Sequence, residues 1–192
     1  MEAKEIIVYF NKIKVNIKLS GVMSESADAC IVPQFDHGIS LSGISCAFIH
    51  SPAVGAISKY QKLIAEKTLK PNDALCSSVE DCNYKYLIQI PVLILKDKTN
   101  KTDAIQNHTT NCVIEALKKA SSVKATSIVL PSMNTGIRYP LSYSEAARAI
   151  LAAIKIFSKT PKANIKEITI ALTSENAFLD FVAKAASLKL ID

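Results

Sequence analysis

Segments typical of β-strands and of helices alternate through most of this chain. Short runs of β-branched and aliphatic residues recur, and several are followed by stretches in which apolar residues have helical spacing. Such alternation is typical of α/β proteins, whose largely parallel sheets are covered by helices on both faces. It argues against helical bundles, β-sandwiches and hairpin barrels. We therefore expect an α/β fold with three layers, α/β/α, around a mixed, mostly parallel central sheet.

The predicted strands are short and rich in β-branched residues. The first two flank Asn11-Lys12, which favours a hairpin-like turn. Pro91 lies inside another apolar run and indicates a sheet edge, a bulge or the end of a strand. We predict strands at Glu5–Phe10, Ile13–Leu19, Asp28–Pro33, Ala74–Val79, Tyr86–Leu95, Thr126–Pro131 and Glu167–Leu172.

The predicted helices show apolar residues at helical spacing. Pro52 should divide the first helical region into a short helix and a longer one. Ser142 is the expected N-cap of a later helix, with Glu145 at the capping-box position. The helical regions are Gly43–Lys67, Lys101–Ser122, Ser144–Phe157 and Ser174–Ser187.

Length and composition favour one domain over residues 1–192, because 192 residues with 49% hydrophobic content can bury a substantial core. The chain shows no signal-peptide pattern and no apolar run that could span a bilayer, so we expect a cytoplasmic protein, or a nuclear one in a eukaryote. Five cysteines without a CxxC pair indicate reduced thiols. Three histidines without partners at ligand spacing favour neither a metal site nor a cofactor.

The formal net charge of +6 favours anionic partners such as nucleotides, nucleic acid or acidic proteins. Only two of the 23 basic residues are arginines, however, and the chain has no tryptophan, so an interface for stacked nucleic-acid bases is weakly supported. Ligands of parallel α/β sheets bind beyond the carboxyl ends of the strands. The loops after Val32 and after Leu130 are therefore the expected binding region.

One segment carries a family resemblance. Ser127-Ile-Val-Leu-Pro-Ser-Met-Asn-Thr-Gly-Ile-Arg-Tyr-Pro, followed by Ser144-Glu-Ala-Ala-Arg-Ala-Ile-Leu-Ala-Ala-Ile, resembles the strand, phosphate loop and helix of macro domains, which usually bind ADP-ribose. Gly38-Ile-Ser-Leu-Ser-Gly-Ile-Ser-Cys-Ala-Phe-Ile stands where that family has its first phosphate loop. The resemblance extends in order over roughly Ile13 to Phe181.

The resemblance implies a module that binds ADP-ribose or a related nucleotide, with its diphosphate between two small-residue turns. Backbone N–H groups can approach phosphate oxygens closely in such turns. Arg138 could add a phosphate contact. The implied ligand-binding residues are Gly21, Val22, Met23, Gly38, Ser40, Gly43, Ile44, Ser132, Asn134, Thr135, Gly136, Ile137, Arg138 and Tyr139.

The chain departs from the family pattern in this region. Gly21-Val22-Met23 stands where macro domains commonly have Gly-Asp-Ile, so the carboxylate that contacts the adenine amino group is missing. Pro33-Gln34-Phe35-Asp36 replaces Asn-Ala-Ala-Asn and lacks the asparagine that usually holds the distal ribose. These departures predict weak binding.

Two other functions stay open. An ADP-ribosyl hydrolase would need a base and an orienting group, for which Asp36 and His37 are the candidate catalytic pair. Alternatively, the scaffold has lost its nucleotide and contacts protein or nucleic acid, with Lys155, Lys159, Lys162 and Lys166 as candidate phosphate contacts. The sequence favours a binding module over an enzyme, with ADP-ribosylated protein as a further candidate partner.

Overall fold

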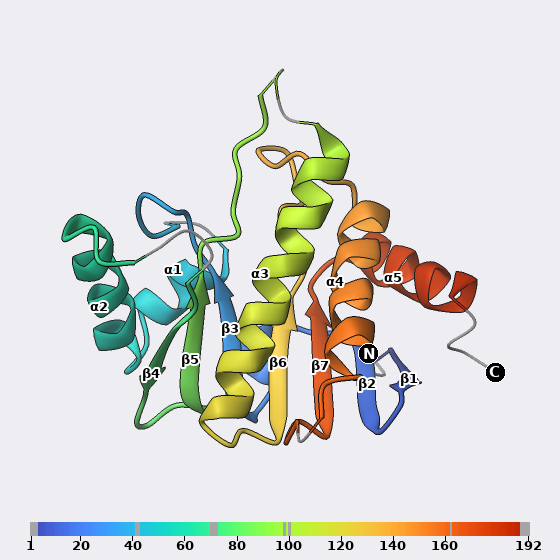
Figure 1. The fold of residues 1–192 in the computed structure, drawn as a ribbon, viewed down its shortest axis with the longest axis horizontal. Helices are drawn as coiled ribbons and strands as arrows, with labels where there is room; N and C mark the ends of the chain where they lie inside the picture. The colour runs from blue at the N-terminus through green and yellow to red at the C-terminus, as the bar shows by residue number, and fades with distance from the viewer. Residues whose placement is uncertain are drawn as a thin grey trace.

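The computed structural model describes residues 4–40, 43–69, 73–97, 99, 101–161 and 163–188. Within them, seven strands form one sheet in the order β1-β2-β7-β6-β3-β5-β4 (Figure 1). Only the pairs β1–β2 and β4–β5 are antiparallel, so the sheet is mixed and mostly parallel, as predicted. The strands are β1 (Glu5–Phe10), β2 (Ile13–Leu19), β3 (Ala27–Pro33), β4 (Leu75–Ser78), β5 (Tyr84–Ile90), β6 (Ser127–Pro131) and β7 (Glu167–Leu172).

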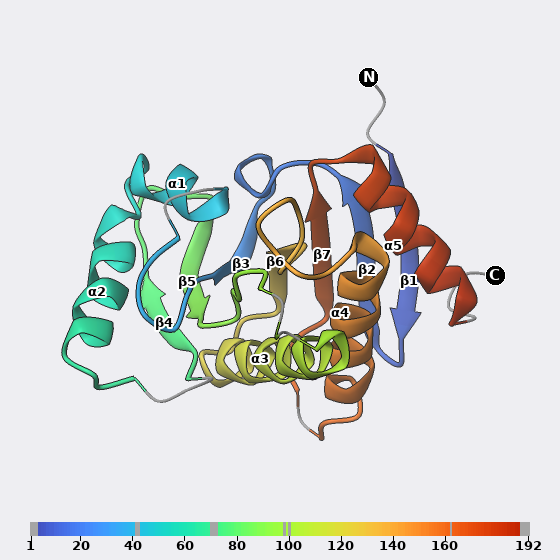
Figure 2. The same ribbon diagram turned by 90° about the horizontal axis from the view of Figure 1, so that it is seen from above.

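Helices cover both faces of the sheet, which confirms the three-layer prediction. Successive residues of a strand point to opposite faces, and in β3 Ile31 belongs to the larger core cluster while Cys30 and Val32 belong to a second one. The larger cluster includes side chains of α3 (Thr102–Ser122), α4 (Tyr143–Phe157) and α5 (Glu175–Ser187). The second packs α1 (Ile44–Ile49) and α2 (Val54–Ala65) against the other face. Figure 2 shows α3 and α4 on one side of the sheet and α1 on the other.

Local sequence signals explain most element boundaries. Asn11 has a φ of 53°, a conformation that asparagine tolerates in tight turns, and it joins β1 to β2. The helical region around Pro52 divides into α1 and α2, as predicted. The Ser142–Glu145 capping box is present at the start of α4. The predicted strand Tyr86–Leu95 is too long, because β5 ends at Ile90 and the chain from Pro91 has no regular structure.

None of the helices in the described part of the chain has both the length and the apolar character needed to cross a membrane.

Candidate functional site

A cavity of about 450 Å³ lies at the carboxyl edge of the parallel strands. Its walls come from the segments that follow β2, β3, β5, β6 and β7, which all reach the same edge because these strands run parallel. This is the position expected for a ligand of such a sheet. The lining residues are Gly21, Val22, Met23, Pro33, Ser40, Gly43, Ile44, Ala47, Leu93, Pro131, Ser132, Asn134, Thr135, Tyr139, Tyr143, Ala171, Thr173, Ser174 and Ala177.

The structure brings most of the predicted ligand-binding residues together in this cavity. Those in the lining are Gly21, Val22, Met23, Ser40, Gly43, Ile44, Ser132, Asn134, Thr135 and Tyr139. Gly38, Gly136, Ile137 and Arg138 are outside it, and Ile137 is 99% exposed at the tip of the loop after β6. The loops after β3 and β6 therefore both contribute to one cavity, while these four residues lie outside its lining.

Asn134 fixes the loop after β6. Its side chain is buried, and its Oδ1 accepts a hydrogen bond from the Ile94 N–H at 2.8 Å. Its Nδ2 donates to the Val92 carbonyl at 2.8 Å and to Thr109 Oγ1 at 3.0 Å. Asn134 and Gly136 have positive φ values of 56° and 105°. The Asn134 side chain is thus committed to the fold, and the turn can face a ligand through its backbone and neighbouring hydroxyls.

Gln34 fixes the loop after β3, a role that the sequence analysis missed. The side chain is fully buried, and its Oε1 accepts hydrogen bonds from the Ser40 N–H at 2.8 Å and Ser45 Oγ at 3.2 Å. Its Nε2 donates to Gln89 Oε1 at 3.1 Å. Gln89 in turn donates to the Ala56 carbonyl of α2 at 2.8 Å. The sequence carries one signal for this role: Gln34 directly follows the apolar run of β3, and Gln89 lies within that of β5, the strand beside it.

The cavity wall carries no charged side chain among the described residues that line it. Its polar character comes mainly from hydroxyl groups, and Ser132 Oγ lies 3.2 Å from Thr135 Oγ1. Gly43 has a φ of 60° directly before α1, a conformation that favours glycine. Such a wall can bind an anion through hydroxyl and backbone N–H groups but offers it no ion pair.

An aromatic contact joins the two loops. The rings of Phe35 and Tyr139 stack with centroids 6.3 Å apart and an interplanar angle of 24°. The Phe35 carbonyl accepts a hydrogen bond from Tyr60 Oη at 2.8 Å. Tyr139 lines the cavity and Phe35 does not, so the stack borders the cavity without filling it.

The candidate catalytic pair lies outside the lining. Asp36 Oδ1 and His37 Nδ1 are 2.7 Å apart, but their side chains are 75% and 72% exposed. The His37 ring lies 5.2 Å from that of Phe35. In this arrangement a ligand inside the cavity would not meet either group.

At the opposite end, two residues of the short 3-10 helix η1 (Val22–Ser24) line the cavity. Tyr84 Oη donates a hydrogen bond to the Val22 carbonyl. Burial and the neighbouring Cys30 raise the pKa of Tyr84, so the phenol stays protonated and remains a donor. Val22 itself is 8% exposed. This end of the cavity is therefore tied to Tyr84, the first residue of β5.

Elsewhere in the described part of the chain, the cysteine, histidine and lysine side chains form no comparable site. Cys112 Sγ lies 3.6 Å from His108 Nε2, but burial raises the pKa of that thiol to about 12, which keeps it protonated. No group of three or more His, Cys, Asp or Glu residues within the described ranges could hold a metal ion. Lys155, Lys159 and Lys166 contribute nothing to the cavity wall, and Lys162 lies outside the described residues.

Known proteins resemble this chain in fold and in part of its sequence. Among solved structures, a macrodomain of Oceanobacillus iheyensis with ADP has a TM-score of 0.82 at 18% identity, covering 98% of each chain. A Trypanosoma brucei macrodomain in complex with ADP-ribose has a TM-score of 0.69 at 14% identity, covering 87% of this chain and 67% of that one. The macrodomain of Mycobacterium tuberculosis DarG has a TM-score of 0.62 at 12% identity, covering 79% and 93%.

At these identities the solved structures establish a shared fold. No curated protein matches the sequence significantly. The family model of the Macro domain matches residues 36–150, more than half of the chain. That range contains the loop after β6, most of the loop after β3, the whole of α1 and the first half of α4. The chain therefore belongs to the macro domain family.

Proposed function

We propose that this protein is a binding module for ADP-ribose or a closely related nucleotide, held in the cavity at the carboxyl edge of the sheet. The observation that carries the proposal is the convergence of two small-residue turns, one at Gly43 and one at Thr135, on one cavity of about 450 Å³. That volume falls within the usual range for small-molecule sites. Structurally similar macrodomains contain ADP or ADP-ribose, which supports this ligand class.

The diphosphate fits the region between the two loops. Gly43 adopts a positive φ there, and Ser132 and Thr135 bring hydroxyl groups to the facing wall. Hydroxyls and backbone N–H groups bind phosphate oxygens well without carrying charge. Because no described residue of the lining has a cationic side chain, we expect modest affinity, as the departures from the family pattern also predict.

Calorimetric titration with ADP-ribose tests this proposal. Ala47 lies in α1 and lines the cavity, so Ala47→Phe should fill part of it and weaken binding by about tenfold or more. His50 lies at the C-cap of the same helix, is exposed and does not line the cavity. His50→Phe is the matched control and should bind like the parent chain. Absence of heat with millimolar ADP-ribose would refute the proposal.

ADP-ribose joined to a protein is a further ligand that we propose for this cavity. Ile137, 99% exposed, and the exposed Arg138 lie on the loop that walls the cavity, where a linked protein could make contact. Hydrolysis is not part of the proposal, because Asp36 and His37 lie outside the lining. A cytoplasmic location stays a prediction, supported by the structure in which all five cysteines are thiols.

A further inference from the structure

The two ends of the cavity differ in polarity, and the difference assigns the parts of a nucleotide ligand. The end between the loops after β3 and β6 has small-residue turns and hydroxyls, which suit phosphate. The end between η1 and α5 is mainly apolar, and its lining residues are Gly21, Val22, Met23, Ala171, Thr173, Ser174 and Ala177. A flat base with apolar faces fits that end best. This assignment rests on the proposed function.

The backbone at the apolar end has little capacity to accept a hydrogen bond from a base. The carbonyls of Gly21, Val22 and Met23 all accept hydrogen bonds already. The Gly21 carbonyl accepts from the Ser24 N–H at 3.0 Å and from Ser24 Oγ at 2.7 Å. The Val22 carbonyl accepts from the Glu25 N–H at 3.4 Å and from Tyr84 Oη. The Met23 carbonyl accepts from Asn83 Nδ2 at 3.0 Å. Two of these three carbonyls thus have both lone pairs in use.

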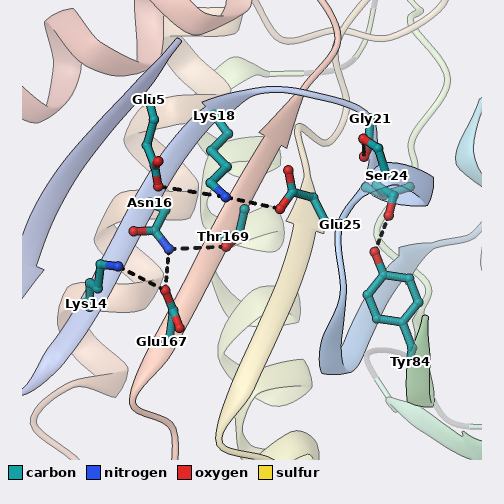
Figure 3. A network of polar contacts seen from close by, with 11 residues as sticks. Glu5, Lys14, Asn16, Lys18, Gly21, Ser24, Glu25, Tyr84, Glu167 and Thr169 are labelled. Atoms are coloured by element: carbon teal, nitrogen blue, oxygen red, sulfur yellow. Dashed lines mark hydrogen bonds and ion pairs between the residues drawn. The ribbon is translucent and has the colours of Figure 1, made fainter. Parts of the chain in front are cut away.

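The nearby carboxylates are also committed elsewhere. Glu25 follows η1, but its Oε2 lies 3.3 Å from Lys18 Nζ and its side chain is 15% exposed (Figure 3). Glu175 begins α5 and pairs with Lys4. Neither glutamate lines the cavity. Among the described residues, none offers a carboxylate to an amino group of a base bound at this end.

The polar side chains at the apolar end are two hydroxyls, those of Thr173 and Ser174. Ser174 Oγ accepts a hydrogen bond from the Ala177 N–H at 3.4 Å, and its own proton stays available. A hydroxyl can donate or accept, so it satisfies a keto group as well as an amino group. A site discriminates strongly only when a group in it can play one role and not the other.

From these contacts we infer that the cavity does not discriminate between amino and keto bases. It takes nucleoside diphosphate riboses as a class, and selects them by the diphosphate and ribose rather than by the edge of the base. Val22 is buried at the base end of the cavity, and its apolar side chain can form no hydrogen bond with the edge of the base.

Calorimetry with ADP-ribose and its inosine counterpart tests the inference, since the two differ only in the base. The parent chain should bind both with dissociation constants within about threefold of each other. Val22→Asp places an acceptor-only group at the base end and should favour ADP-ribose by about tenfold or more. The ratio measured on the parent chain tests the inference even if the buried aspartate impairs folding, and Val22→Ile is the apolar control that should keep the parent ratio.

The outcomes separate this inference from the proposed function. A parent chain that binds ADP-ribose more than about tenfold better than the inosine ligand overturns the inference and leaves the proposed function standing. The inference also fails if both ligands bind equally to a folded Val22→Asp chain, because Val22 would then lie away from the base. Binding of neither ligand to the parent chain overturns the proposed function, and the inference with it.

Discussion

The two loops that wall the cavity are each anchored by one buried amide side chain, but the anchors work differently. Asn134 joins the loop after β6 to the backbone of the segment after β5 and to α3. The Gln34 side chain bonds to Ser40 in its own loop and to Ser45 at the start of α1, and it reaches β5 and α2 through a second side chain, Gln89.

This difference separates global from local support. Loss of Asn134 would leave polar groups unpaired on two other parts of the fold, whereas loss of Gln34 would chiefly release the loop that carries Ser40. We therefore expect the first anchor to matter more for the stability of the whole chain. The second should matter more for the shape of one cavity wall.

The largest expected effect is that of Asn134→Ala. The change leaves the Ile94 N–H, the Val92 carbonyl and Thr109 Oγ1 without this partner, which should lower the free energy of unfolding by about 3 kcal/mol. Urea denaturation followed by circular dichroism measures it. Thr109→Val removes only one of these contacts and should cost about 1 kcal/mol. Equal losses in the two variants would show that Asn134 is not a shared anchor.

The contrast between the two anchors also marks what the sequence could predict. Alternating apolar segments are governed by local periodicity, so nearly all strands and helices were predicted near their observed bounds. Asn134 was predicted as a ligand-binding residue because it belongs to a small-residue turn, yet its side chain bonds to segments about 25 to 42 positions away along the chain. Contacts at such separations leave no periodic signal.

The cavity shows the same division. The sequence placed it at the correct sheet edge, because parallel strands share one carboxyl edge. It missed Leu93, Tyr143 and the start of α5, which enter the lining only once the chain has folded. Pro91 indicated a sheet edge, a bulge or the end of a strand, and only the structure shows that β5 ends there, at Ile90.

Gln34→Ala should have the next largest effect. It leaves the Ser40 N–H and Gln89 Oε1 without this partner inside the fold, and should lower the free energy of unfolding by about 2 kcal/mol. Because Ser40 lines the cavity, affinity for ADP-ribose should fall as well. Comparing melting temperature with calorimetric affinity separates the two effects. A stability loss larger than that of Asn134→Ala would reverse the proposed order of the anchors.

Gly43→Ala addresses the loop after β3 through its backbone. A φ of 60° is unfavourable for alanine although the space around Gly43 is open, so the variant should be destabilised by about 1 to 2 kcal/mol. Gly55 lies inside α2, also in open space but without a positive φ. Gly55→Ala is the matched control and should stabilise the chain by up to about 1 kcal/mol. Thermal unfolding of both variants checks the sign, and a shift in the same direction would contradict the argument.

The smallest effect is expected at the opposite edge of the sheet, where the contacts are made by a charged side chain, Asp28, and not by a buried amide. Asp28 Oδ1 lies 2.7 Å from Lys85 Nζ, and its Oδ2 accepts hydrogen bonds from the Thr126 N–H at 2.8 Å and Thr126 Oγ1 at 2.7 Å. The hydrogen bond from Lys85, followed by those from Thr126, holds the pKa of Asp28 well below its usual range. The start of β3 is thereby tied to β5 and to the chain before β6.

Because the pKa of Asp28 is lower in the folded state, its contribution to stability is complete above the unfolded pKa of about 4 and is lost as the pH falls below it. Asp28→Asn keeps an acceptor for Thr126 but removes the charge, so it should cost about 1 kcal/mol near neutral pH, since Lys85 is largely exposed and the ion pair is screened. The cost should shrink toward pH 3, where the carboxylate of the unfolded parent chain becomes protonated and the charge stabilises the fold less.

Urea denaturation at pH 7 and pH 3 measures this change. The affinity for ADP-ribose at pH 7 should not change, because Asp28 is not part of the cavity lining. A pH-independent difference would mean that the charge of Asp28 does not stabilise this edge.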